Sequence, residues 1–122
     1  MSPNALASIM LTLDSHSVEK VGNIYHHPAS HYGSMPESVI VQLPDPADWL
    51  RLADHAFDLD AGQLLAGSAS LSGSTIYCYL HMDGFKVQTG IPLALIGDVE
   101  DVLHIMGVKE LEAWKALAEV AA

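Results

Sequence analysis

The alternation of apolar and polar residues on either side of Asp83-Gly84 constrains this chain more than any other feature. Residues 76–82 and 85–91 both alternate in this way, as strands with one buried face do. Asp-Gly tolerates the positive φ angles of a two-residue hairpin turn. Such a turn brings the two alternations into register. On the apolar face it predicts the pairs Met82–Phe85, Leu80–Val87, Cys78–Thr89 and Ile76–Ile91.

The other face of this hairpin is polar and aromatic. The same register predicts the pairs His81–Lys86, Tyr79–Gln88 and Tyr77–Gly90. An aromatic ring opposite a strand glycine covers the bare backbone there. Tyr77 and Tyr79 are therefore expected side by side on the face away from the apolar pairs, as a contact patch or beneath a helix.

A second turn signal, Ser72-Gly73, predicts a third strand. It places Ala69 opposite Ile76 and Leu65 opposite Leu80, on the same apolar face as before. Two independent turns that agree on one buried face are mutually supporting. We therefore predict a three-stranded antiparallel meander over residues 64–91.

Three helices are predicted around this meander. Asp45 and Pro46 suit the N-cap and first position of a helix over 46–57. Asp98 is the predicted N-cap of a helix over 98–106, which Gly107 ends, and a last helix covers 109–121. Their predicted buried stripes are Trp49, Leu52, Ala53, Ala56 and Phe57; Val99, Val102, Leu103 and Met106; and Leu111, Trp114, Leu117, Ala118 and Ala121.

The N-terminal third has weaker patterns. Ser8–Leu13 alternates as a half-buried strand does, and Ser38–Leu43 reads as a strand with Val39, Val41 and Leu43 on one side. Val18–Tyr25 fits a short strand or one helical turn, and residues 26–37 fit a loop. The sequence thus predicts a single α+β domain over residues 1–122. Its antiparallel sheet has about five strands and packs against the helices near 46–57, 98–106 and 109–121.

The balance of charge excludes several kinds of partner. Five Lys and Arg oppose fifteen Asp and Glu, for a formal net charge of −10. Binding to nucleic acid rests on Lys and Arg that neutralise phosphates, so we expect no direct nucleic-acid partner and no anionic membrane surface. A basic protein partner is favoured instead.

Cysteine usage and the N-terminus predict a cytoplasmic protein. Cys78 is the one cysteine, so no internal disulfide can form. Residues 1–4 carry no basic side chain, and the apolar stretch that follows is shorter than a signal peptide requires. In the predicted register Cys78 points into the core, where a thiol is inert.

Three histidines within six residues, His26, His27 and His31, could hold Zn²⁺ or another divalent transition metal. Their spacing matches no standard metal signature. The chain would then be a small metal-binding protein or a metal-dependent enzyme. Otherwise these histidines belong to a surface loop, and no cofactor is expected.

The leading hypothesis is a non-enzymatic interaction module that docks on a basic, nucleic-acid-binding protein and inhibits it. Bacterial immunity proteins and phage-encoded inhibitors share this size and charge, and no motif selects either group. Tyrosines supply contact area with a polar tip. The predicted contact residues are Tyr77, Tyr79, Asp54, Asp58, Asp60, Glu100 and Glu112. A homodimer through a sheet edge or the terminal helices is a further possibility.

Overall fold

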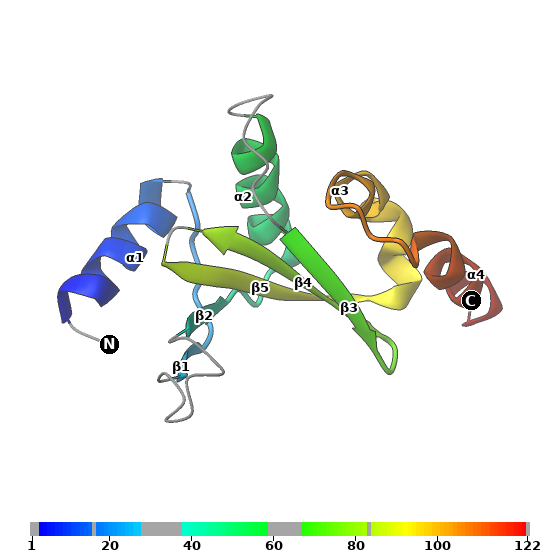
Figure 1. The fold of residues 1–122 in the computed structure, drawn as a ribbon, viewed down its shortest axis with the longest axis horizontal. Helices are drawn as coiled ribbons and strands as arrows, with labels where there is room; N and C mark the ends of the chain where they lie inside the picture. Colours follow the sequence, from blue (N-terminus) through cyan, green and yellow to red (C-terminus); the bar gives the residue numbers. More distant parts are fainter. Residues whose placement is uncertain (1–2, 16, 28–37, 59–66, 83, 122) are drawn as a thin grey trace.

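The chain forms one five-stranded sheet with helices on one of its faces, which confirms the predicted α+β class (Figure 1). The computed structural model describes residues 3–15, 17–27, 38–58, 67–82 and 84–121. The helices are α1 (Pro3–Ser15), α2 (Pro46–Asp58), the 3-10 helix η1 (Leu93–Asp98), α3 (Glu100–Ile105) and α4 (Leu111–Ala121). The strands are β1 (Ile24–His27), β2 (Ser38–Gln42), β3 (Gly67–Ser72), β4 (Thr75–Met82) and β5 (Phe85–Pro92).

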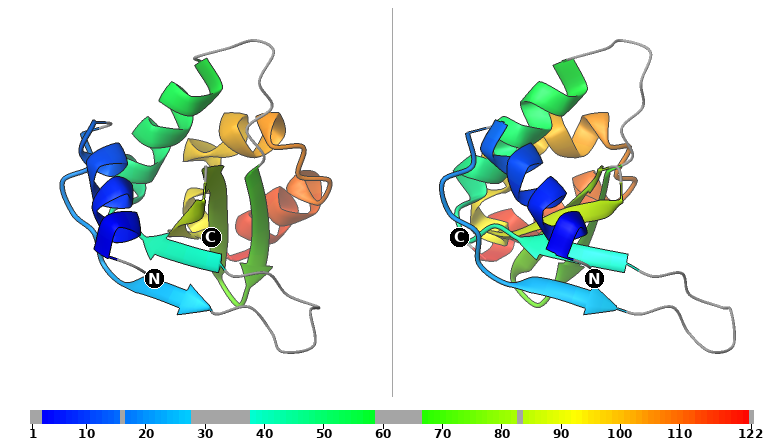
Figure 2. Two further views of the ribbon diagram at one scale, coloured as in Figure 1. Left: turned by 60° about the vertical axis from the view of Figure 1, so that its left-hand side comes forward. Right: turned by 90° about the vertical axis from the view of Figure 1, so that its left-hand side faces the viewer.

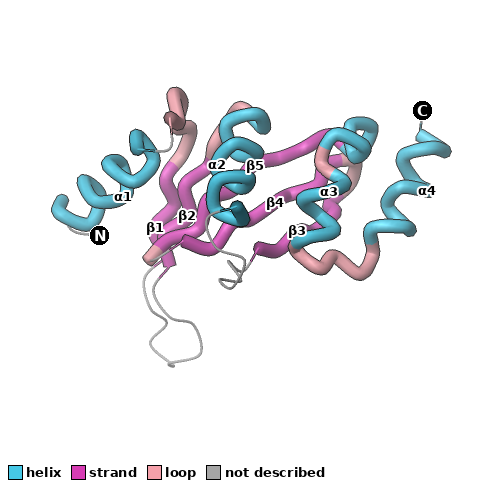
Figure 3. Tube along the Cα trace, turned by 90° about the horizontal axis from the view of Figure 1, so that it is seen from above, coloured by secondary structure: helices cyan, strands magenta, loops and turns pink. Residues whose placement is uncertain are grey.

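The strands lie in the order β1-β2-β5-β4-β3. Every neighbouring pair is antiparallel except β2 and β5, which are parallel, so the sheet is mixed rather than wholly antiparallel. Between these two strands the chain passes through α2 and the β3-β4 hairpin. Seen from above, α2 and α3 lie over the strands, with α1 and α4 at the two ends of the sheet (Figure 3). The sheet is strongly twisted, so β1 and β2 are turned against β3 and β4 (Figure 2).

The β4-β5 hairpin has the register that the sequence predicts, pair for pair, from Met82–Phe85 to Ile76–Ile91. Gly84 has a φ of +85°, as the turn requires. Ile76, Cys78, Leu80, Val87 and Thr89 are fully buried. Tyr77, Tyr79 and His81 alternate with them on the opposite face, as predicted.

The predicted register of β3 is wrong by two residues. Ala69 lies opposite Cys78, Leu71 opposite Ile76 and Gly67 opposite Leu80. The turn is built on Gly73-Ser74 rather than Ser72-Gly73, because Gly73 supplies the positive φ of +61° at the first turn position. Since side chains alternate with a period of two, this shift keeps Ala69 and Leu71 on the covered face. Leu65 lies outside the described residues.

Helix α2 fixes the centre of the core. Asp45 Oδ1 accepts a hydrogen bond of 2.9 Å from the backbone N–H of Ala47, which confirms the predicted N-terminal cap. Trp49, Leu52 and Ala53 are fully buried. The Trp49 indole N–H donates to the carbonyl oxygen of Val87 in β5 at 2.9 Å. This helix is therefore both packed and hydrogen-bonded onto the sheet.

Residues Ser8–Leu13 are helical, so the predicted strand there is wrong. They belong to α1, a helix of 13 residues in which Ile9 and Leu13 are buried and Leu11 is 70% exposed. Ile9 and Leu13 are four apart, so they lie on one side of a helix as well as on one side of a strand. Ala, Leu and Met around them favour the helix.

Two details of the C-terminal helices also differ from prediction. Asp98 does not cap α3. It ends η1, and α3 follows Val99 without a side-chain cap. Leu117, predicted to be buried, is 49% exposed on α4, whereas Leu111, Trp114 and Ala118 are buried. Gly107, with a φ of +75°, follows α3 as predicted.

Candidate interaction surface

The face of the sheet away from α2 and α3 is the candidate site, and we call it the open face. No described helix lies beneath it in Figure 1. Along β2, β4 and β5 its side chains alternate with buried ones. Strand β1 contributes Tyr25, which pairs with Ile40 and so lies on the same face. The open face consists of Tyr25, Ser38, Ile40, Gln42, Ser68, Ser70, Ser72, Thr75, Tyr77, Tyr79, His81, Lys86, Gln88 and Gly90.

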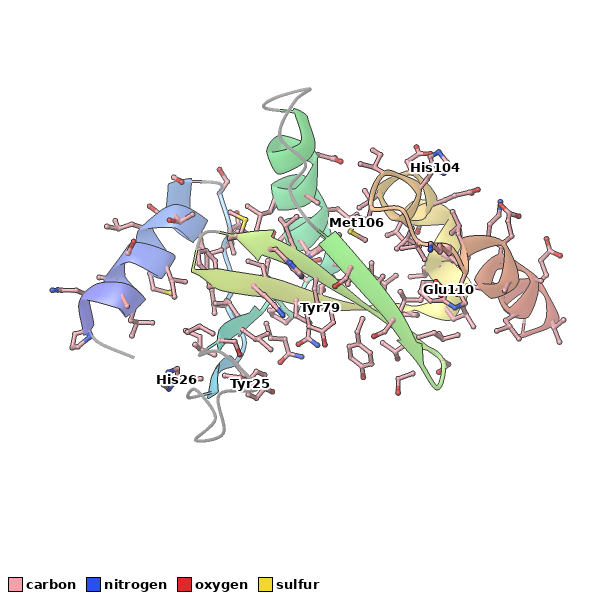
Figure 4. All side chains as sticks on the ribbon, in the orientation of Figure 1. Tyr25, His26, Tyr79, His104, Met106 and Glu110 are labelled. Carbon is pink, nitrogen blue, oxygen red and sulfur yellow. The ribbon has the colours of Figure 1, made fainter. Side chains whose placement is uncertain are left out.

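Hydrogen bonds hold two of its three tyrosines in place. Gln88 Nε2 donates to the hydroxyl of Tyr79 at 2.9 Å. Asn23 Nδ2 lies 3.2 Å from the hydroxyl of Tyr25 and 3.3 Å from Oε1 of Gln42. Figure 4 shows Tyr25 and Tyr79 on the side of the sheet away from the helices. Rings fixed in this way lose little conformational entropy on binding.

Tyr77 covers the backbone of its partner strand, as its predicted pairing with Gly90 implies. A Cβ at Gly90 would lie 3.7 Å from the Tyr77 ring and 3.2 Å from Cγ2 of Thr75. The ring thus occupies the space that a side chain at position 90 would use. Tyr77 and Tyr79 lie two residues apart on the same face of β4, and both are half-buried.

Among the described residues, the open face carries no carboxylate, in a chain with a net charge of −10. None of the five described strands contains Asp or Glu, so the acids of the described chain lie on the helices and the connections. Lys86 pairs with His81 across β4 and β5. Partial burial and then the charge of Lys86 lower the pKa of His81 below its ordinary value. These two residues and Ser38 line a hollow of about 290 Å³ at one end of the face.

The structure does not bring the predicted acids together with Tyr77 and Tyr79. Asp54 lies in α2, Glu100 in α3 and Glu112 in α4, on the helical side of the sheet. Asp58 is the last residue of α2, and Asp60 lies outside the described residues. Acids and tyrosines therefore form two surfaces, separated by the sheet.

Two of those acids already have a partner within the chain. Lys115 Nζ lies 2.5 Å from Oε1 of Glu100 and 3.7 Å from Oε1 of Glu112. The hydrogen bond that Lys115 donates to Glu100 is the first cause of the raised pKa of Lys115. Asp54 is exposed on the helical side.

Tyr25 is the described open-face tyrosine that the sequence-based prediction of contact residues omits. It is 43% exposed and lies across the sheet from the other tyrosines, on an edge strand of four residues. A strand this short has no clear alternation of its own. Only its pairing with Ile40 shows that Tyr25 lies on the open face, and that pairing depends on the fold.

The predicted metal ligands are only partly described. His26 and His27 occupy consecutive positions of β1, opposite Val39 and Ser38, and His31 lies outside the described residues. Among the residues that the structure describes, no three His, Cys, Asp or Glu side chains are close enough to hold a metal ion.

Cys78 lies on the covered face, as its predicted register requires, and it is fully buried. Burial raises the pKa of its thiol to about 12. The thiolate is the reactive form of cysteine, so this thiol is inert at neutral pH.

In the described segments no helix combines the length and apolarity that crossing a bilayer demands. No protein-family model matches the chain, and no curated protein or solved structure matches it significantly.

Proposed function

We propose that this chain is a non-enzymatic interaction module that binds a basic protein through the open face of its sheet. The basic partner is a nuclease or another nucleic-acid-binding protein, which the bound module blocks. The observation that carries the proposal is an aromatic face that no described helix covers and that has no carboxylate among its described residues, on a strongly acidic chain. A single buried thiol suits the reducing cytoplasm, where we place this encounter.

The open face has the composition of a binding surface. Tyrosine is enriched among residues that dominate binding energy, and charged residues are depleted at the centre of interfaces. Tyr77 and Tyr79 lie next to one another with Gln88 beneath the Tyr79 hydroxyl. The serines of β3 and the amides of Gln42 and Gln88 surround them with groups that both donate and accept hydrogen bonds.

The acids have a different part in this proposal from the one expected from sequence. Because Asp54, Glu100 and Glu112 lie on the helical side, they contribute to the field of the whole molecule rather than to contacts on the open face. Such a field speeds the approach of a basic partner, and salt weakens it. We therefore expect added salt to slow association much more than it speeds dissociation.

Site-specific photo-cross-linking tests the proposal. A photoreactive phenylalanine analogue at position 79 is expected to cross-link the partner in the source cell extract, and the same analogue at position 54 on α2 is the matched control. The cross-linked protein should be basic, and excess unlabelled chain should compete with it. Cross-links from position 54 but not from position 79 would assign binding to the helical side and refute the open face.

A further inference from the structure

In the described part of the chain, strand β3 is an edge of the sheet with no neighbouring strand on its outer side. It pairs with β4 alone in the described chain, so the backbone groups along its outer side have no strand to bond. Natural edge strands are usually blocked by Lys, Pro, a bulge or extreme shortness. The six residues of Gly67–Ser72 contain no charge and no proline, and their pairing with β4 is regular throughout.

The sequence of β3 is complementary to itself in one antiparallel register. With Ser70 of one copy opposite Ser70 of another, Ser68 faces Ser72 on the side of the open face. On the covered side, Ala69 faces Leu71. This register keeps polar residues with polar ones and apolar residues with apolar ones, whereas a shift by one residue would mix the two faces. Opposed hydroxyl side chains on neighbouring strands also hydrogen-bond across the pair.

A hollow lined by both apolar and polar residues, Lys109 and Glu110 among them, lies beside this edge. It has a volume of about 280 Å³ and lies between Gly67–Ala69 and the α3-α4 connection at 106–110. A Cβ at Gly67 would collide with the sulfur of Met106, so the bare glycine is what allows Met106 to pack there. In the self-paired register, Leu71 of the second copy lies beside Ala69, at this hollow.

We propose that the chain forms a homodimer by antiparallel pairing of β3 with β3 of a second copy. Leu71 of each copy packs against Ala69 and the hollow of the other, and one continuous sheet runs through both copies. The two open faces then join into one surface. The dimer shares the serines of β3 with the open face but does not involve its tyrosines, so it does not require the function proposed above.

Long-range charge opposes the dimer, whereas it favours binding to a basic partner. Two copies of net charge −10 repel each other, while the paired edges themselves carry no charge. Salt screens the repulsion and leaves the backbone hydrogen bonds, so we expect dimerisation to strengthen with salt. Association with a basic partner is expected to weaken with salt, and the two proposals can therefore fail separately.

Introducing a positive or a negative charge at position 70 tests the dimer. Ser70 is exposed, so Ser70→Lys and Ser70→Asp leave the monomer fold intact, while each places like charges face to face in the dimer. Sedimentation of the full chain should show a wild-type dimer, a dissociation constant about fivefold higher or more for each variant, and recovery when the two variants are mixed. Ala116→Lys on the exposed side of α4 is the control and should dimerise as the wild type does.

Three results would overturn this proposal. A wild-type chain that stays monomeric at every concentration and salt has no self-pairing edge. Ser70 variants that dimerise as strongly as the wild type place the interface elsewhere. Variants that weaken the dimer but do not recover on mixing show that the two positions do not face each other.

Discussion

Trp49→Ala is expected to destabilise the protein by about 3–5 kcal/mol, a large part of the roughly 5–15 kcal/mol that holds a domain of this size folded. Trp49 is fully buried between α2 and the sheet. Its replacement leaves a cavity and also removes the indole N–H that donates to the Val87 carbonyl. Denaturation by urea, followed by far-ultraviolet circular dichroism, measures the loss as a lower midpoint.

Two further variants show which part of Trp49 matters. Trp49→Phe keeps most of the apolar volume and loses the hydrogen bond, so we expect a smaller cost of about 1–3 kcal/mol. Val120→Ala, at a side chain 86% exposed on α4, should change stability by less than about 0.5 kcal/mol. If Trp49→Ala had no larger effect than Val120→Ala, α2 would not be anchored on β5 as described.

The double variant Tyr77→Ser, Tyr79→Ser is expected to weaken binding of the cross-linked partner by about a hundredfold or more. Two tyrosines at the centre of an interface together contribute more than about 2.8 kcal/mol when each is a dominant contact. Both side chains are half-buried on the open face, so their loss removes contact area without opening the core. Calorimetry or a surface-binding assay with the purified partner measures the change, and circular dichroism confirms the fold.

The matched control lies on the other side of the sheet. Asp54 and Glu119 are both exposed on helices, and Asp54→Asn with Glu119→Gln lowers the negative charge without touching the open face. This double variant should slow association at low salt and leave dissociation unchanged. If instead the acidic variant lost binding and the tyrosine variant kept it, the partner would dock on the helical side.

The sequence predicts the fold correctly where a turn signal and a long alternation of apolar and polar residues occur together. The β4-β5 register followed from Asp83-Gly84 and two alternations of seven residues, because a two-residue turn admits one register. At Ser72-Gly73 the same logic failed by two residues, since either of two adjacent turns satisfies a weak, serine-rich strand. In Ser8–Leu13 the alternation was too short to separate a strand from a helix.

The candidate site was predicted in its parts but not in its assembly. Tyr77 and Tyr79 were placed on the right face because alternation is a local property. The separation of those tyrosines from Asp54, Glu100 and Glu112 depends on which face the helices cover, and no local pattern encodes it. The pairing of Lys115 with Glu100 joins residues of two helices and likewise requires the tertiary structure.

The reactivity of two adjacent positions, Cys78 and Tyr79, tests the two-faced sheet most directly. In the variant Tyr79→Cys, a thiol reagent should modify one cysteine per folded chain at once and the second only after denaturation. The wild-type chain, whose Cys78 is fully buried, should not react while folded. Rapid reaction of wild-type Cys78 would mean that the helices do not seal their face, and an unreactive Tyr79→Cys thiol would mean that the open face is covered.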